Sequence, residues 1–177
     1  MGYFPLCIDL SGKTVFLVGD GTQIREKAEK LKPFSPRMVF FSDLTSEDLA
    51  ADPALVIVGD REYGDAEQIS RLCTARRIPV NVVDAPGLCT FFFPSLITEG
   101  DLTVSVSTGG SSPAAAAYLR RQIEETLPDR TEEILRWLGE NRASLRKAGI
   151  LKEAVAAAFR NNRPLSSEEC MLLGKVQ

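Results

Sequence analysis

Two glycines that stand directly after an apolar stretch could form a binding site for a phosphate group. Segment 13–27 reads Lys-Thr-Val-Phe-Leu-Val-Gly-Asp-Gly-Thr-Gln-Ile-Arg-Glu-Lys, and its apolar residues stop at Gly19 and Gly21. We expect a strand, then a tight turn, then a helix that begins near Thr22. The backbone N–H groups at the start of this helix could bind an anion. The pattern is G-x-G-x-x-Ile, because Ile24 stands where a small residue usually lets the helix pack closely on the strand. A glycine-rich turn without a nucleotide is the alternative interpretation.

Asp43 is a second candidate for contact with a nucleotide. It follows the apolar run 37–41 and lies about twenty residues beyond the glycine turn, where dinucleotide-binding folds place an acid against the ribose hydroxyls. An acid there disfavours a 2′-phosphate, so the sequence favours NAD over NADP. Asp43 could instead only cap a short helix over residues 45–49.

Asp84 stands at the end of a predicted strand, where a carboxylate could meet a ligand. It ends the apolar run 78–83. The chain contains no histidine, so a Ser-His-Asp triad, a histidine-metal site and an imidazole base are excluded. Proton transfer must therefore use carboxylates, Lys, Tyr, Cys or water, and we expect no metal site. A turn-forming role ahead of Pro86 is the alternative for Asp84.

A second glycine-rich turn precedes a helix that is expected over residues 113–127. Ser112 is suited to the N-cap and Pro113 to the first helical position. The N–H groups at this helix start, with Arg120 and Arg121 further along, could bind carboxylates of a ligand. An ordinary capped helix start and a solvated arginine face are the alternatives. The candidate ligand-binding residues of this turn are Thr108, Gly109, Gly110, Ser111 and Ser112.

These candidate groups need strands and helices to hold them. Largely apolar runs predict strands over 14–18, 37–41, 54–58 and 78–83, and a helix is expected over 65–77. This alternation predicts an α/β fold with a doubly wound parallel sheet, in which ligands bind at the carboxyl ends of the strands. Gly19, Asp43, Gly59 and Asp84 all stand at such ends. We therefore expect them to line one crevice.

The chain changes in character after Asp84. Residues 91–93 are all phenylalanine, and an alternating pattern predicts a strand over 101–107. Three neighbouring phenylalanines cannot all face one small core, so we expect some of them in a subunit interface, and hence a homodimer. Residues 128–177 have helical apolar spacing, and 166–169 resemble a capping box. The predicted domains are 1–86 for NAD binding, 87–127 for dimerisation and 128–177 as a small C-terminal helical domain.

Composition narrows the class of protein. A net charge of −3 argues against a nucleic-acid surface, and no apolar run approaches the ~20 residues of a membrane span. The N-terminus lacks the basic and apolar regions of a signal peptide. The four cysteines are scattered and form no C-x-x-C pair, which is typical of a reduced compartment. We expect a cytoplasmic protein with neither nucleic acid nor membrane as a partner.

Several motifs together resemble a known family. They lie in chain order at 13–27, 81–86 (Asn-Val-Val-Asp-Ala-Pro), 91–97, 100–104 and 107–113 (Ser-Thr-Gly-Gly-Ser-Ser-Pro). They resemble the precorrin-2 dehydrogenase and sirohydrochlorin ferrochelatase family, the N-terminal part of siroheme synthase, and the motifs at 81–86 and 107–113 are the most specific. Proteins of this family oxidise precorrin-2 to sirohydrochlorin with NAD, and some also insert ferrous iron to give sirohaem. They form intertwined dimers.

The resemblance implies a Rossmann-like fold, NAD as cofactor, the tetrapyrrole precorrin-2 as substrate and a second copy of the chain as partner. It assigns the role of catalytic carboxylate, which would accept a proton, to Asp84, and Asp60 is the next candidate for this role. The cofactor contacts that it implies are Gly19, Gly21, Thr22, Gln23, Asp43 and Leu44.

The sequence also departs from the pattern of this family. Asp20 replaces a glycine, Ile24 replaces a small residue, and segment 44–53 is too short for an additional strand and turn. Gly59-Asp60 stands where Ala-Thr-Asp is more usual. Because all of these changes touch the cofactor half, one alternative is a non-catalytic tetrapyrrole-binding or carrier protein with a degenerate NAD site. Another is an NAD-sensing module whose helical end contacts a partner.

Overall fold

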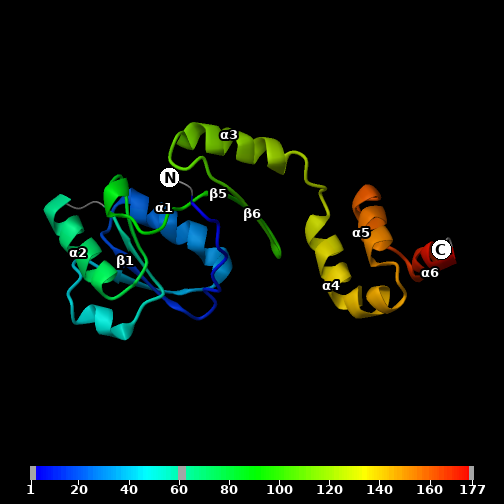
Figure 1. Cartoon of the computed structure of the whole chain (residues 1–177), viewed down its shortest axis with the longest axis horizontal. Coiled ribbons are helices and arrows are strands. Elements are labelled where there is room, and N and C mark those ends of the chain that lie inside the picture. The colour runs from blue at the N-terminus through cyan, green and yellow to red at the C-terminus, as the bar shows by residue number, and fades with distance from the viewer. Residues whose placement is uncertain (1–2, 60–62, 176–177) are drawn as a thin grey trace. The chain divides into compact units, whose positions relative to one another are not determined.

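The computed structural model describes residues 3–59 and 63–175. The chain forms two compact units: Pro5–Phe93 makes one, and Met1–Phe4 with Pro94–Gln177 makes the other. Figure 1 shows the elements of both units in chain order. No helix within the described ranges is both long enough and apolar enough to cross a bilayer. The functional division at residues 86 and 127 stays a prediction.

A four-stranded parallel sheet forms the first unit, as the apolar runs predicted. Its strand order is β2-β1-β3-β4. The strands are β1 (Thr14–Val18), β2 (Arg37–Phe41), β3 (Leu55–Val58) and β4 (Val80–Val82). In the register, Val18 pairs with both Phe41 and Val58. The turns after β1, β2 and β3 therefore leave the sheet at one edge.

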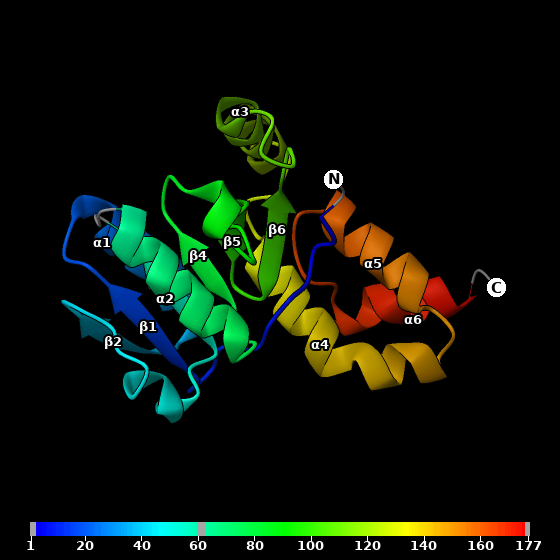
Figure 2. The same cartoon turned by 60° about the vertical axis from the view of Figure 1, so that its left-hand side comes forward.

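Helices cover both faces of this sheet, which confirms the doubly wound fold. Because side chains alternate along a strand, β1 and β3 feed two separate cores. One core joins Val15, Leu17, Leu55 and Ile57 to Ile24, Ala28 and Leu31 of α1 (Thr22–Leu31). The other joins Phe16, Val18, Val56, Val58, Val80 and Val82 to Ala66, Ile69 and Cys73 of α2 (Tyr63–Ala75). Figure 2 shows α2 crossing in front of the strands.

The alternative role of Asp43, as the cap of a short helix over 45–49, is not what the structure has. Residues there form a 3-10 turn, η2 (Asp48–Ala51), whose N-cap is Glu47 rather than Asp43. Thr45 and Asp48 bond to each other and fix the chain before the turn: the Thr45 N–H and hydroxyl donate to Asp48 Oδ2 at 2.8 and 2.6 Å. The two other 3-10 turns of this unit are η1 (Lys32–Phe34) and η3 (Pro86–Leu88).

Two of the three consecutive phenylalanines pack into the core of their own unit. Phe91 and Phe93 lie against the core on the α1 side, with their ring centroids 5.5 Å apart. Phe92 is 38% exposed. The three rings therefore do not all face this core, and a subunit interface that covers Phe92 stays a prediction.

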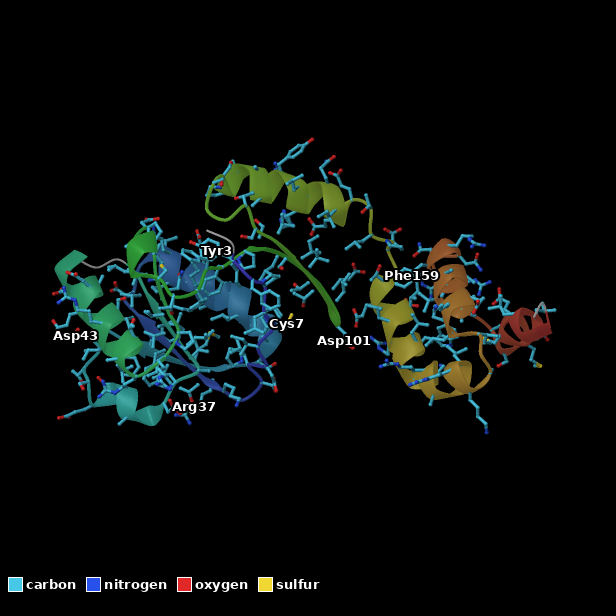
Figure 3. The ribbon with its side chains drawn as sticks, in the orientation of Figure 1. Tyr3, Cys7, Arg37, Asp43, Asp101 and Phe159 are labelled. Carbon is cyan, nitrogen blue, oxygen red and sulfur yellow. The ribbon has the colours of Figure 1, made fainter. Side chains whose placement is uncertain are left out.

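The second unit contains a hairpin followed by helices. Strands β5 (Ser95–Glu99) and β6 (Leu102–Val106) pair antiparallel, and α3 (Pro113–Glu124) contacts both of them. Figure 3 labels Asp101 at the tip of this hairpin. The sequence predicted β6 but not β5, because the aromatic residues ahead of β5 obscured its short alternation.

Three C-terminal helices share one apolar core, as their spacing predicted. They are α4 (Thr131–Lys147), α5 (Leu151–Arg160) and α6 (Ser167–Lys175). Phe159 packs against this core (Figure 3). The capping box at the start of α6 is confirmed: the Ser166 N–H donates to Glu169 Oε2 at 2.8 Å, and the Glu169 N–H donates to Ser166 Oγ at 3.2 Å.

Candidate cofactor and active site

Gly19 makes a close backbone contact that a larger residue would prevent. Its φ is +109°, and a Cβ atom at this position would lie 2.5 Å from the carbonyl oxygen of Gly59. Its N–H donates to the Phe41 carbonyl at 2.9 Å. The first glycine is therefore required where the ends of β1, β2 and β3 meet.

The start of α1 offers backbone N–H groups to an anion. Gly21 is the N-cap in an extended conformation, and no side chain among the described residues caps the first turn. The first turn also carries no acidic residue. Because the first N–H groups of a helix lack an intrahelical acceptor, those of Thr22, Gln23 and Ile24 can receive a phosphate. Exposed Asp20 opposes this with its negative charge.

Ile24 and Gly59 are complementary in size. Ile24 is fully buried, and a Cβ atom on Gly59 would lie 2.8 Å from its Cγ1 and 3.1 Å from its Cδ1. The larger helix residue thus occupies the space that a side chain at the end of β3 would need. Two departures from the family pattern are therefore one packing exchange that preserves the contact between helix and strand. Sequence reasoning listed both changes without joining them.

Asp43 lies just beyond the end of β2 (Figure 3). It is exposed, and its Oδ1 accepts the Leu44 N–H at 2.9 Å. Leu44 itself is buried in the core on the α2 side, so only its backbone can contact a cofactor. The position of Asp43 is compatible with a ribose contact, which stays a prediction.

Asp84 and Gln23 are brought together from positions 61 residues apart in the chain. The Gln23 Nε2 donates to Asp84 Oδ2 at 2.9 Å. Asp84 has a φ of +58°, and its turn is closed by the Ala85 N–H, which donates to the Val82 carbonyl. The backbone of Asp84 thus forms a turn, while its exposed carboxylate meets the helix that follows the glycine turn. Asp60, the next candidate base, lies outside the described residues.

Sequence reasoning missed two side chains around Asp84. Lys27 is half-buried, and its Nζ lies 4.5 Å from the centroid of the Phe93 ring. Burial lowers the pKa of Lys27. The Cys89 thiol accepts the Val82 N–H at 3.2 Å, and burial raises its pKa, so it is a neutral group that holds the chain after β4. The available signal for Lys27 was its spacing of one helical turn from Gln23.

The second glycine-rich turn is held by its own hydrogen bonds. Ser112 Oγ accepts the Ala115 N–H at 3.1 Å, which confirms the N-cap. Thr108 Oγ1 accepts the Ser112 N–H at 3.1 Å, and the Ser111 N–H donates to the Thr108 carbonyl at 3.1 Å. These bonds match an ordinary capped helix start. Binding of substrate by residues 108–112 stays a prediction.

The arginines of α3 differ in their surroundings. Arg120 pairs with Glu124 at 2.6 Å across one helical turn, as expected of a solvated helix face. Arg121 is exposed. Neither observation assigns a ligand to these arginines.

Comparison with known proteins shows which proteins this chain resembles. Residues 99–126 match the model for "Sirohaem biosynthesis protein central", and residues 42–95 match one described as "Putative NAD(P)-binding". The chain is 34% identical over 148 residues to a siroheme synthase of Thioalkalivibrio sulfidiphilus, an alignment that covers 72% of this chain and 30% of that one. It resembles one part of siroheme synthase. The siroheme synthase of Citrobacter koseri is 30% identical over 167 residues, which cover 83% of this chain and 36% of the relative. The chain thus spans about a third of the length of these siroheme synthases.

The fold is also known from a solved structure. A protein titled "SirC, precorrin-2 dehydrogenase" matches with a TM-score of 0.68 over 98% of both chains, at 14% identity. This likeness is one of fold. Within the sequence, the NAD(P)-binding match includes Asp43 and Asp84, whereas the glycine turn at 19–21 precedes it.

The residues at the edge of the sheet fit a dinucleotide. Gly19 has no side chain, so the backbone can approach closely at this position. At Gly21, the N-cap of α1, no side chain among the described residues caps the first N–H groups of the helix. Asp43 stands beyond the neighbouring strand and within residues 42–95, which match the NAD(P)-binding model. Asp20 is the one change that works against an anionic ligand. The donor set is therefore suited to NAD(P).

Proposed function

We propose that this chain oxidises precorrin-2 to sirohydrochlorin with NAD, as part of sirohaem biosynthesis. The similarity to siroheme synthases supports this reaction, and the hydrogen bond between Gln23 and Asp84 is the single observation that carries it. That bond holds a carboxylate against the first turn of the helix that would bind the cofactor. A hydride acceptor and a proton acceptor would then serve one substrate.

Each residue at this edge has a separate task in the proposal. The backbone at Gly19 and Gly21, with the N–H groups of Thr22 and Gln23, binds the diphosphate. Asp43 bonds to the ribose hydroxyls and repels a 2′-phosphate, so NAD is preferred to NADP. Bound NAD supplies the acceptor for the hydride.

Asp84 accepts the proton that the macrocycle loses. Gln23 donates to its Oδ2 and so orients the carboxylate, while Oδ1 receives the proton. The same carboxylate would remove pyrrole N–H protons if ferrous iron is inserted as a second substrate. One substitution at Asp84 would then reduce both activities.

Turnover of precorrin-2 by the purified protein tests the proposal. We expect the absorption spectrum of sirohydrochlorin to appear with NAD, and much more slowly with NADP. A protein that binds the tetrapyrrole but produces no sirohydrochlorin with either cofactor would refute the dehydrogenase.

The second candidate function is a non-catalytic tetrapyrrole carrier. Exposed Asp20 favours it, because a negative charge inside the glycine turn weakens the binding of a diphosphate. Calorimetry separates the two functions, since a carrier of this kind binds the tetrapyrrole but neither NAD nor NADP. Binding of NAD at micromolar concentration would exclude the carrier with a degenerate NAD site.

We also propose a cytoplasmic homodimer built through residues 87–127. The exposed ring of Phe92 and the four cysteines, all present as free thiols, support this setting. A monomeric mass by light scattering at micromolar concentration would contradict the dimer.

A further inference from the structure

One face of α1 carries both Gln23 and a half-buried cation, Lys27. These residues lie one helical turn apart, so their side chains leave the helix in nearly the same direction. Gln23 donates to Asp84, and the Lys27 ammonium lies over the ring of Phe93, 4.5 Å from its centroid. The charge of Asp84 acts on Lys27. The cation and the candidate base therefore occupy one neighbourhood.

The ammonium of Lys27 is half-buried, which disfavours its charged form. Burial is the first cause that lowers the pKa of Lys27 and the charge of Lys30 is the second, while the charges of Glu26 and Asp84 act in the opposite direction. Within residues 3–59 and 63–175, no ion pair includes Lys27. A neutral side chain of the same length could pack over Phe93 without the loss of hydration. Apart from its contact with the Phe93 ring, this half-buried charge has no ion pair among the described residues, which points to a role in binding a ligand.

An anionic ligand would supply the oppositely charged partner that the ammonium lacks among the described residues. The ammonium lies over the ring of Phe93 and feels the charge of Asp84, the candidate base, which favours the substrate over the cofactor diphosphate as that ligand. The tetrapyrrole substrate carries many carboxylates, and its reacting carbon must approach Asp84. Resting on the proposed function, we propose that Lys27 binds a substrate carboxylate and so positions the macrocycle beside Asp84.

Substitution of Lys27 by methionine tests this role, because methionine keeps the apolar stem over Phe93 and removes the charge. We expect Lys27→Met to raise the KM for precorrin-2 and the Kd for uroporphyrin, a stable octacarboxylate tetrapyrrole, by about tenfold or more. The affinity for NAD should stay unchanged, and the thermal midpoint should stay equal or rise, because a desolvated charge is removed. Lys27→Arg should restore much of the affinity for both tetrapyrroles.

Lys30→Met is the matched control, since Lys30 is exposed on the same helix and carries the same charge. It should leave both constants within about twofold of the wild type. If Lys27→Met and wild-type protein have the same KM for precorrin-2 and the same Kd for uroporphyrin, the proposed role of Lys27 is wrong. If Lys27→Met and Lys30→Met raise these constants equally, the effect comes from net charge alone. If wild-type protein binds uroporphyrin more tightly than Lys27→Met but does not oxidise precorrin-2, the carboxylate site stands and the dehydrogenase falls. If neither tetrapyrrole binds, both proposals fall.

Discussion

Substitution of Gly59 by alanine tests the packing exchange that keeps the glycine turn in place. The added Cβ would lie 2.8 and 3.1 Å from two atoms of Ile24 and 3.7 Å from Val83 Cγ2. Ile24 is fully buried and cannot turn aside. Overpacking of this kind costs about 1–3 kcal/mol, and the lower chain entropy of alanine returns about 0.4–1 kcal/mol. We therefore expect Gly59→Ala to lower the free energy of unfolding by about 1–2 kcal/mol.

A double-mutant cycle shows whether the clash is with Ile24. Ile24→Ala alone removes both contacting atoms but leaves a cavity, at a cost of about 2–5 kcal/mol. In the double variant the new methyl group has room, so the combined loss should be smaller than the sum of the single losses by about 1–2 kcal/mol.

Urea denaturation followed by circular dichroism measures all of these free energies. Gly87→Ala is the control, because a Cβ atom at Gly87 would meet no atom within 4 Å. Additive losses in the cycle, or a stability of Gly59→Ala equal to that of the control, would refute the complementarity of Ile24 and Gly59.

Two further predictions concern charged side chains. Asp43→Ser should reduce the preference for NAD over NADP by about tenfold or more, because the substitution removes the repulsion of the 2′-phosphate. Calorimetry with both cofactors measures this preference, and an unchanged preference would show that Asp43 does not contact the ribose. Arg163, followed by the Ser166 N–H, lowers the pKa of Glu169 from 4.5 to about 2. The stability that this carboxylate contributes to the C-terminal helices is therefore complete above pH 4.5 and is lost as the pH falls toward 2. Melting curves of wild type and Glu169→Gln should converge over that range, and a constant difference between pH 7 and pH 3 would contradict the assignment.

The sheet could be predicted from sequence because its signal is local. Strands buried on both faces, such as 14–18 and 54–58, appear as uninterrupted apolar runs, and glycine or aspartate marks their ends. The capped starts of α3 and α6 were predicted for the same reason, since an N-cap and its partners lie within four residues.

The candidate site was only partly predictable, because it depends on contacts between distant segments. Nothing in the sequence around Ile24 shows that Gly59 will lie against it. Likewise, Lys27 resembles any solvated helix lysine until the chain at Phe93 covers it. The alternative of a helix capped by Asp43 gave way to the 3-10 turn η2, ahead of which Thr45 and Asp48 bond to each other in the manner of a capping box.

Turnover by Asp84→Asn tests the central claim most directly. Asparagine preserves the shape of the side chain and its contact with Gln23 but removes the proton acceptor. We predict that kcat for precorrin-2 oxidation falls by about 10²- to 10⁴-fold, while the affinity for NAD and the unfolding midpoint are unchanged. Turnover by the folded variant at a rate close to that of wild type would contradict the role of Asp84 as the base.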